Sequence, residues 1–196
     1  MKIIEIMKES ALLLGLKDER SYMEMYGQGD TTCEYVPAQE NVSSLFNLVK
    51  YAIRELCTNY IPMIDALNIV TTNNKFALAE LPNYIRIQNV CKNGEPVKFK
   101  IINRNVILEE DGEYEVTYAT YPEIETYDDE IDFLDNFSPD VLVMGLCSYY
   151  ALAHGMFEEF EKMHEQYVEK AESLKHLKIF EMPSRRWQWE IKKLLR

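Results

Sequence analysis

One long stretch, Ser138–Leu177, constrains the fold more than any other part of the sequence. It begins with Ser-Pro-Asp at positions 138–140, which supplies a capping hydroxyl, a fixed φ and a carboxylate at the positive end of a helix dipole. Almost every residue from Val141 to Ala153 is apolar, so this half predicts a helix in the centre of the molecule.

The second half of the stretch has a different pattern. Its apolar residues recur every three or four positions beside charged ones, namely at Met156, Phe160, Met163, Tyr167, Ala171 and Leu174. This spacing predicts an amphipathic helix on a surface. Gly155 lies at the junction and marks either a break between two helices or a weak point in one, since glycine costs about 1 kcal/mol in a helix interior.

Two more helices are predicted near the N-terminus. Residues 3–14 place their apolar side chains on one face, and Gly15 then supplies a helix stop. Pro37 opens a longer helix with a broad apolar stripe, which Pro62 ends. Residues 17–36 lie between these helices and show no sustained period, so we expect a long loop there.

The apolar period changes to two between residues 75 and 121. Short β-rich runs alternate with Asn-Gly, Asn-Arg-Asn and Asp-Gly turns, and the runs are Tyr84–Val90, Val97–Ile102, Val106–Leu108 and Tyr114–Tyr121. This pattern predicts an antiparallel meander. In its last strand Tyr114, Val116 and Tyr118 share one face, which we expect to pack on helices while the other face is wet.

These elements define an α+β protein: a helical bundle with an inserted antiparallel β meander and a C-terminal arm. We expect residues 1–182 to form a single domain, whose helices come from residues 1–60 and 138–177 and whose meander comes from residues 75–121. An acidic linker over residues 123–136 leads into the central helix, and residues 183–196 form the arm.

Charge excludes one class of function. The net charge of −12 would repel a phosphate backbone, so we expect no sequence-specific nucleic-acid partner. The charge is unevenly distributed, because residues 183–196 carry five basic residues against the single acid Glu190. No apolar run is long enough to span a bilayer and no signal peptide is recognisable, so we expect no membrane partner and a location in the cytoplasm.

The sequence shows no catalytic motif, and we predict neither enzymatic activity nor a cofactor. The four cysteines form no CxxC pair and are expected to be free thiols. The acids between Asp128 and Asp135 are numerous enough to gather a divalent cation, but the glycine of an EF-hand is absent, and a solvated linker is favoured. His164-Glu165 lacks the second histidine of a zinc-protease motif. We therefore predict no metal site.

The arm carries a cluster of aromatic and basic residues of the kind enriched at binding hot spots. They are Arg185, Arg186, Trp187 and Trp189, and a short amphipathic terminal helix is expected around them. Two interpretations stay open: the cluster is a docking surface, or it belongs to a terminal helix that folds back on the core of the protein.

Several motifs resemble those of the head–tail connector, or adaptor, proteins of tailed bacteriophages, including the tail tubular A type. The first helix ends in a leucine-glycine step at Leu14-Gly15, and a longer helix then exits to the extended Tyr60-Ile61-Pro62. The β insertion ends in a strand with Gly112, Tyr114, Val116, Tyr118, Tyr121 and Pro122, and the Pro-led helix Pro139–Gly155 closes the core. The acidic linker and the arm depart from the family pattern.

The resemblance implies a structural protein of the virion, made in the host cytoplasm. It implies a ring, usually of twelve copies, between the portal protein and the tail or nozzle proteins, with a channel through which DNA passes. In such a ring the arm would dock on a neighbour, along a surface formed by Glu158, Glu159, Glu161 and Glu165, or on an acidic surface of the portal. The alternatives are a small acidic bacterial protein-interaction module and a metal-dependent hydrolase that uses the carboxylates of residues 128–135.

Overall fold

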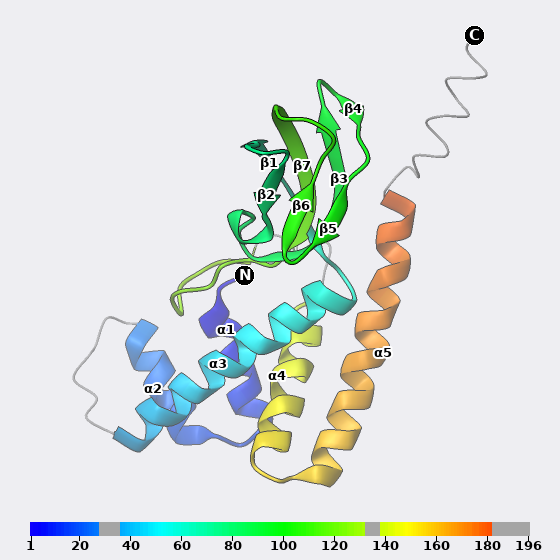
Figure 1. Ribbon diagram of the computed structural model, residues 1–196. Coiled ribbons are helices and arrows are strands. Elements are labelled where there is room, and N and C mark those ends of the chain that lie inside the picture. Colours follow the sequence, from blue (N-terminus) through cyan, green and yellow to red (C-terminus); the bar gives the residue numbers. More distant parts are fainter. Residues whose placement is uncertain (28–35, 132–137, 182–196) are drawn as a thin grey trace. The chain divides into compact units, whose positions relative to one another are not determined.

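The computed structural model describes residues 1–27, 36–131 and 138–181 (Figure 1). The chain divides into two compact units. The first, which we call the helical unit, comprises Met1–Ala52 and Glu125–Arg196, and the second, the β unit, comprises Ile53–Ile124. The β unit is thus an insertion between two halves of the helical one, and the α+β class expected from the sequence is confirmed.

Five helices are found in the part of the chain that the structure describes (Figure 1). They are α1 (Ile3–Leu13), α2 (Lys17–Gly27), α3 (Val36–Asn59), α4 (Asp140–Ala153) and α5 (Phe157–Glu181). The predicted helices at residues 3–14 and 37–60 correspond to α1 and α3. Gly15 has a φ of +72°, which the absence of a Cβ makes accessible, and it ends α1 as expected.

The long C-terminal stretch forms two helices, because Gly155 has a φ of +71° and breaks the chain between α4 and α5. This resolves the choice that the sequence left open. The start of α4 differs from the expectation. Its N-cap is Pro139, which makes no side-chain capping bond, and the N–H of Val141 donates to the carbonyl of Ser138 at 3.3 Å. A backbone group therefore takes the place of the expected hydroxyl.

The long loop expected over residues 17–36 is wrong for Lys17–Gly27, which forms α2. This helix buries little apolar surface, but Met23 is 1% exposed and anchors it. The carboxylate of Glu19 is buried as well and accepts a hydrogen bond of 2.7 Å from the side-chain amide of Asn41 on α3. Residues 28–35 lie outside the described residues.

Two antiparallel sheets make up the β unit. The larger has the order β1-β7-β3-β4 and consists of β1 (Met63–Val70), β7 (Glu113–Thr120), β3 (Tyr84–Lys92) and β4 (Glu95–Pro96). The smaller has the order β2-β6-β5 and consists of β2 (Lys75–Ala77), β6 (Asn105–Ile107) and β5 (Lys100–Ile102). A 3-10 turn, η1 (Leu78–Glu80), follows β2.

Three details of the expected meander are corrected. The strands are antiparallel, but the order is not sequential, since β7 lies between β1 and β3. The first strand, Met63–Val70, precedes the region that the sequence assigned to strands, and Val97–Phe99 is not in a strand. The apolar face of β7 is buried as expected, but Tyr114, Val116 and Tyr118 pack in a core made by the β unit itself and not on helices.

That core contains side chains of both sheets. Its buried members are Ile69, Phe76, Leu81, Val90, Val106, Leu108, Tyr114, Val116 and Tyr118. Because β2 and β6 contribute Phe76 and Val106, the smaller sheet covers the apolar face of the larger one. The β unit therefore has its own hydrophobic core.

Candidate functional site

The acidic surface predicted in the second half of the stretch Ser138–Leu177 lies on α5. Glu158, Glu159, Glu161 and Glu165 are all exposed there. The opposite face of α5 buries Tyr167, Ala171 and Leu174. Arg185, Arg186, Trp187 and Trp189, the proposed partners of these glutamates, lie outside the described residues. The acidic surface is thus present, and its contact with the arm stays a prediction.

A close approach of two helices fixes the direction of this acidic surface. Gly145 on α4 has no side chain, and a Cβ there would lie 3.0 Å from Cε2 of Tyr167 and 3.4 Å from the Cβ of Ala52. The Tyr167 ring therefore fills the space at Gly145. Since Tyr167 is fully buried, it orients α5 so that the glutamates at positions 158–165 face solvent.

Aromatic rings make further contacts on α3, α4 and α5. Tyr149 contacts Tyr51 edge-on at 4.8 Å between centroids, and Phe160 stacks on His164 at 5.0 Å. Phe160 is only half-buried, so the apolar face predicted from the sequence is fully buried only from Tyr167 onward. The Nδ1 atom of His164 is buried without a hydrogen-bond partner among the described residues.

The acidic linker is ordered over residues 125–131, where we expected a solvated connection. The N–H groups of Ile3 and Ile4 donate to the carbonyls of Asp129 at 3.0 Å and Tyr127 at 2.9 Å, and the N–H of Ile131 donates to the carbonyl of Met1 at 3.1 Å. These bonds occupy amides at the start of α1 that have no partner within the helix. The linker therefore joins the two halves of the helical unit.

The carboxylates of this linker are used structurally. The carboxylate of Asp128 pairs with Nζ of Lys2 at 3.0 Å. Asp129 accepts a bond from the hydroxyl of Thr126 at 2.6 Å and from the N–H groups of Thr126 at 2.9 Å and Glu125 at 2.7 Å. These hydrogen bonds, led by the Thr126 hydroxyl, lower the pKa of Asp129. Asp132 and Asp135 lie outside the described residues.

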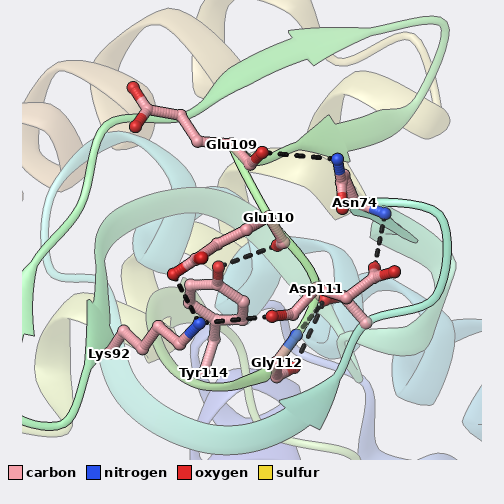
Figure 2. A network of polar contacts seen from close by, with 8 residues as sticks. Asn74, Lys92, Glu109, Glu110, Asp111, Gly112 and Tyr114 are labelled. Atoms are coloured by element: carbon pink, nitrogen blue, oxygen red, sulfur yellow. Dashed lines mark hydrogen bonds and ion pairs between the residues drawn. The ribbon is translucent and has the colours of Figure 1, made fainter.

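A second polar cluster holds the turn before β7 (Figure 2). Nζ of Lys92 donates to the carboxylate of Glu110 at 2.6 Å and to the carbonyl of Asp111 at 3.2 Å, and the hydroxyl of Tyr114 donates to the carbonyl of Glu110 at 2.9 Å. The N–H of Asn74 donates to the Asp111 carboxylate at 2.6 Å. Lys92, Glu110 and Asp111 each have a local partner, so we assign the cluster a structural role.

The turn also connects to the end of β1. The N–H of Thr71 donates to the carbonyl of Gly112 at 2.9 Å, and the N–H of Gly112 donates to the Thr71 hydroxyl at 3.0 Å. Gly112 lies close to Lys92, because a Cβ at this position would be 2.8 Å from Nζ (Figure 2). The turn therefore fixes where β1 and β7 begin to pair.

The β unit exposes one surface that the sequence did not indicate. β1 is the outer strand of its sheet, and all eight of its residues pair with β7 in an uninterrupted register. Most of its side chains are exposed, including Ile64 at 38% and Val70 at 74%. The signal available in the sequence was the group of β-branched residues after Pro62, which lacks the strict alternation of a half-buried strand.

The described residues show no catalytic arrangement. They contain no group of three metal-binding side chains. The thiols of Cys91 and Cys147 are buried and free, as expected, and Cys57 is buried as well. Burial raises the pKa of Cys147 to about 11, so this thiol stays protonated at neutral pH. Among the described helices, none has the length and apolarity required to cross a membrane.

The sequence matches no protein-family model, and no curated protein shows significant similarity to it.

Proposed function

We propose that this protein is a non-enzymatic structural component of a phage virion. It forms a ring that joins the portal of the head to the tail and leaves a channel for DNA. The observation that carries the proposal is the order of elements: a short helix ending at Gly15, the long α3, an inserted β unit that ends in β7, and the Pro-led α4. This is the order on which the resemblance to connector proteins rests.

The surfaces of the two units suit repeated contacts between copies. The helical unit exposes the row of glutamates on α5, and the β unit exposes the edge of β1. A surface that contacts a different surface of the next copy generates a closed ring when the rotation is right. The net charge of −12 also suits a channel lining, because it repels DNA and so permits passage without adhesion.

The oligomeric state tests the proposal. We expect weak assembly of the purified chain at low ionic strength, because its acidic copies repel one another, and stronger assembly when salt screens this repulsion. Light scattering coupled to size exclusion, run over a range of protein and salt concentrations, measures this directly. Binding to portal-bearing heads is the second readout. A chain that stays monomeric in high salt and also fails to bind such heads is not a connector.

A further inference from the structure

We propose that the open edge of β1 accepts residues 186–192 of a neighbouring copy as an added strand. The inference rests on the proposed function, because it names the contact by which one copy holds the next. It also selects between two acidic surfaces for the arm, the glutamates of α5 and the edge of β1.

The backbone of β1 shows which groups face outward. Thr71 pairs with Gly112 through its N–H, which points toward the β7 side, and backbone groups in a strand alternate in direction. The N–H and C=O groups of Ile64, Ala66, Asn68 and Val70 therefore point to the open edge. One further contact agrees, since the N–H of Ala66 is bonded to the carboxylate of its neighbour Asp65 at 2.8 Å and not to β7.

The edge is long and lacks the usual protection against strand pairing. Edge strands are commonly blocked by lysine, by proline, by a bulge or by being very short. β1 contains neither lysine nor proline, and it pairs with β7 without a register shift from Met63 to Val70. Among the residues that the structure describes, only the Asp65 carboxylate covers one of these donors. An extended segment of seven residues fits this edge along nearly its whole length.

Charge favours a basic occupant. Asp65 lies on β1 itself, and Glu113 and Glu115 are exposed on the adjacent β7. Glu115 lies directly opposite Asn68 and Glu113 directly opposite Val70, so both carboxylates share the face on which Ile64 and Val70 are exposed. The segment from Met63 to Thr72 has no basic residue. The surface thus combines apolar side chains with acids that form no ion pair with a described residue.

The arm has the complementary pattern. In residues 186–192 the apolar Trp187, Trp189 and Ile191 alternate with Gln188 and Glu190, which is the period of a strand. Basic residues flank this run on both sides, at positions 185, 186, 192 and 193. These residues lie outside the described part of the chain. The alternation also fits less well with the terminal helix expected above.

The β1 edge offers binding partners to more groups of the arm than the α5 glutamates do. Both surfaces offer carboxylates to the arginines and lysines. Only β1 also offers backbone donors and acceptors to an extended chain and an exposed apolar face to its tryptophans. Recognition by strand addition takes its affinity from the backbone bonds and its specificity from alternate side chains, and β1 provides for both.

Disulfide trapping between full-length chains tests the inference. One population carries Leu67→Cys and the other Gln188→Cys. Leu67 is 37% exposed, and its backbone faces β7, so it forms the closer, non-hydrogen-bonded type of pair with an added strand. Under mild oxidation we expect a mixed dimer, with the 67–188 bridge identified by mass spectrometry. Its yield should exceed that of a Glu158→Cys and Gln188→Cys mixture by about tenfold, since the docked arm has a high effective concentration at β1.

A second pair of variants separates the backbone bond from the side chain. Asn68→Pro removes an outward N–H, which an edge strand tolerates, whereas Asn68→Ala keeps it. Added as a competitor without a cysteine substitution, the wild-type chain should lower the yield of the 67–188 bridge. We expect the alanine variant to lower it equally and the proline variant to lose this ability. Thermal melting of both variants confirms that they fold. Equal competition by the two variants overturns strand addition.

The remaining outcomes are distinct. A bridge that forms mainly with Glu158→Cys places the arm on α5 and overturns the inference. A dimer of Leu67→Cys chains alone means that β1 pairs with β1 of a second copy, which overturns the inference. In a chain that carries both Leu67→Cys and Gln188→Cys, a bridge formed only within that chain means that the arm folds back on its own β1, which also overturns the inference. Rings without the 67–188 bridge leave the proposed function intact while rejecting this contact. The bridge without rings supports the contact and removes support for the ring.

Discussion

The Tyr167 ring on α5 lies where a side chain at position 145 of α4 would be. A Cβ on Gly145 would be 3.0 Å from Cε2 of Tyr167, which is tighter than nine in ten real Cβ contacts, so the ring would have to give by a few tenths of an ångström. Because Tyr167 is fully buried, its ring has little room to move. The two helices therefore pack at a distance that leaves a side chain at this position too little room unless the ring gives way.

We expect Gly145→Ala to destabilise the helical unit by about 1–2 kcal/mol. Alanine is the better helix former by about 1 kcal/mol, but overpacking against a buried ring costs more than that. Urea denaturation measures the difference. The matched control is the same substitution in a Tyr167→Leu background, where the ring is gone and Gly145→Ala should be neutral or stabilising. Equal effects in both backgrounds would show that the ring is not the cause.

Two aromatic residues of α5 should differ sharply in their contribution to stability. Tyr167→Ala empties a fully buried site and should cost about 3–5 kcal/mol. Phe160→Ala removes a half-buried ring stacked on His164 and should cost about 1–2 kcal/mol. Chemical denaturation of the two variants side by side checks the ranking. A larger loss at Phe160 would mean that α5 buries a different face.

The pH dependence of stability should include a contribution from Asp129. Its hydrogen bonds with Thr126 and Glu125 lower its pKa in the folded state, so they favour the charged form. The stabilisation is complete above the unfolded pKa of about 4 and is lost as the pH falls through the lower folded pKa. Asp129→Asn should therefore be less stable than wild type at pH 7, with a smaller difference at pH 3.

Asp128→Asn is the control for that experiment. Asp128 makes an exposed ion pair with Lys2, and solvent screens such pairs so that they contribute little to stability. We expect little change in unfolding free energy at either pH. If the two variants behave alike, the bonds to Thr126 and Glu125 do not hold the linker in place.

Removal of the arm should separate folding from assembly. A chain that ends at Met182 keeps every element that the structure describes, and we expect its thermal midpoint to stay within about 2 °C of wild type. Its self-association and its binding to portal-bearing heads should be lost, because the arm supplies the contact with the neighbour. A midpoint lowered by many degrees would instead assign Trp187 and Trp189 to the protein's own core.

The sequence predicts the long periodic elements of this protein well. α1, α3, α4 and α5 have clear apolar faces and glycine or proline at their ends, and these are the signals that fix a helix locally. α2 was missed because its main anchors are the single apolar side chain of Met23 and the buried carboxylate of Glu19, and the partner of Glu19 is on another helix. Such a contact has no periodic signature.

Strand order and the open edge were less predictable. β1 has apolar residues on both faces, since Ile69 points to the core while Ile64 and Val70 are exposed, so its alternation is hidden. The position of β7 between β1 and β3 depends on long-range pairing, which no local pattern encodes. The glutamates of α5 were correctly expected on a surface, because charged residues beside an apolar stripe must face water.

The insertion of the β unit has a consequence for the order in which the chain folds. The strands and turns of Ile53–Ile124 are contiguous in the sequence and can pair as soon as they leave the ribosome. In contrast, α1 can form its hydrogen bonds to the carbonyls of Tyr127 and Asp129, and its packing against α4, only after those later residues have been synthesised. During synthesis the helices of Met1–Ala52 therefore expose their apolar faces until the last third of the chain arrives. The nascent β unit is thus the first part able to offer its open edge to another molecule.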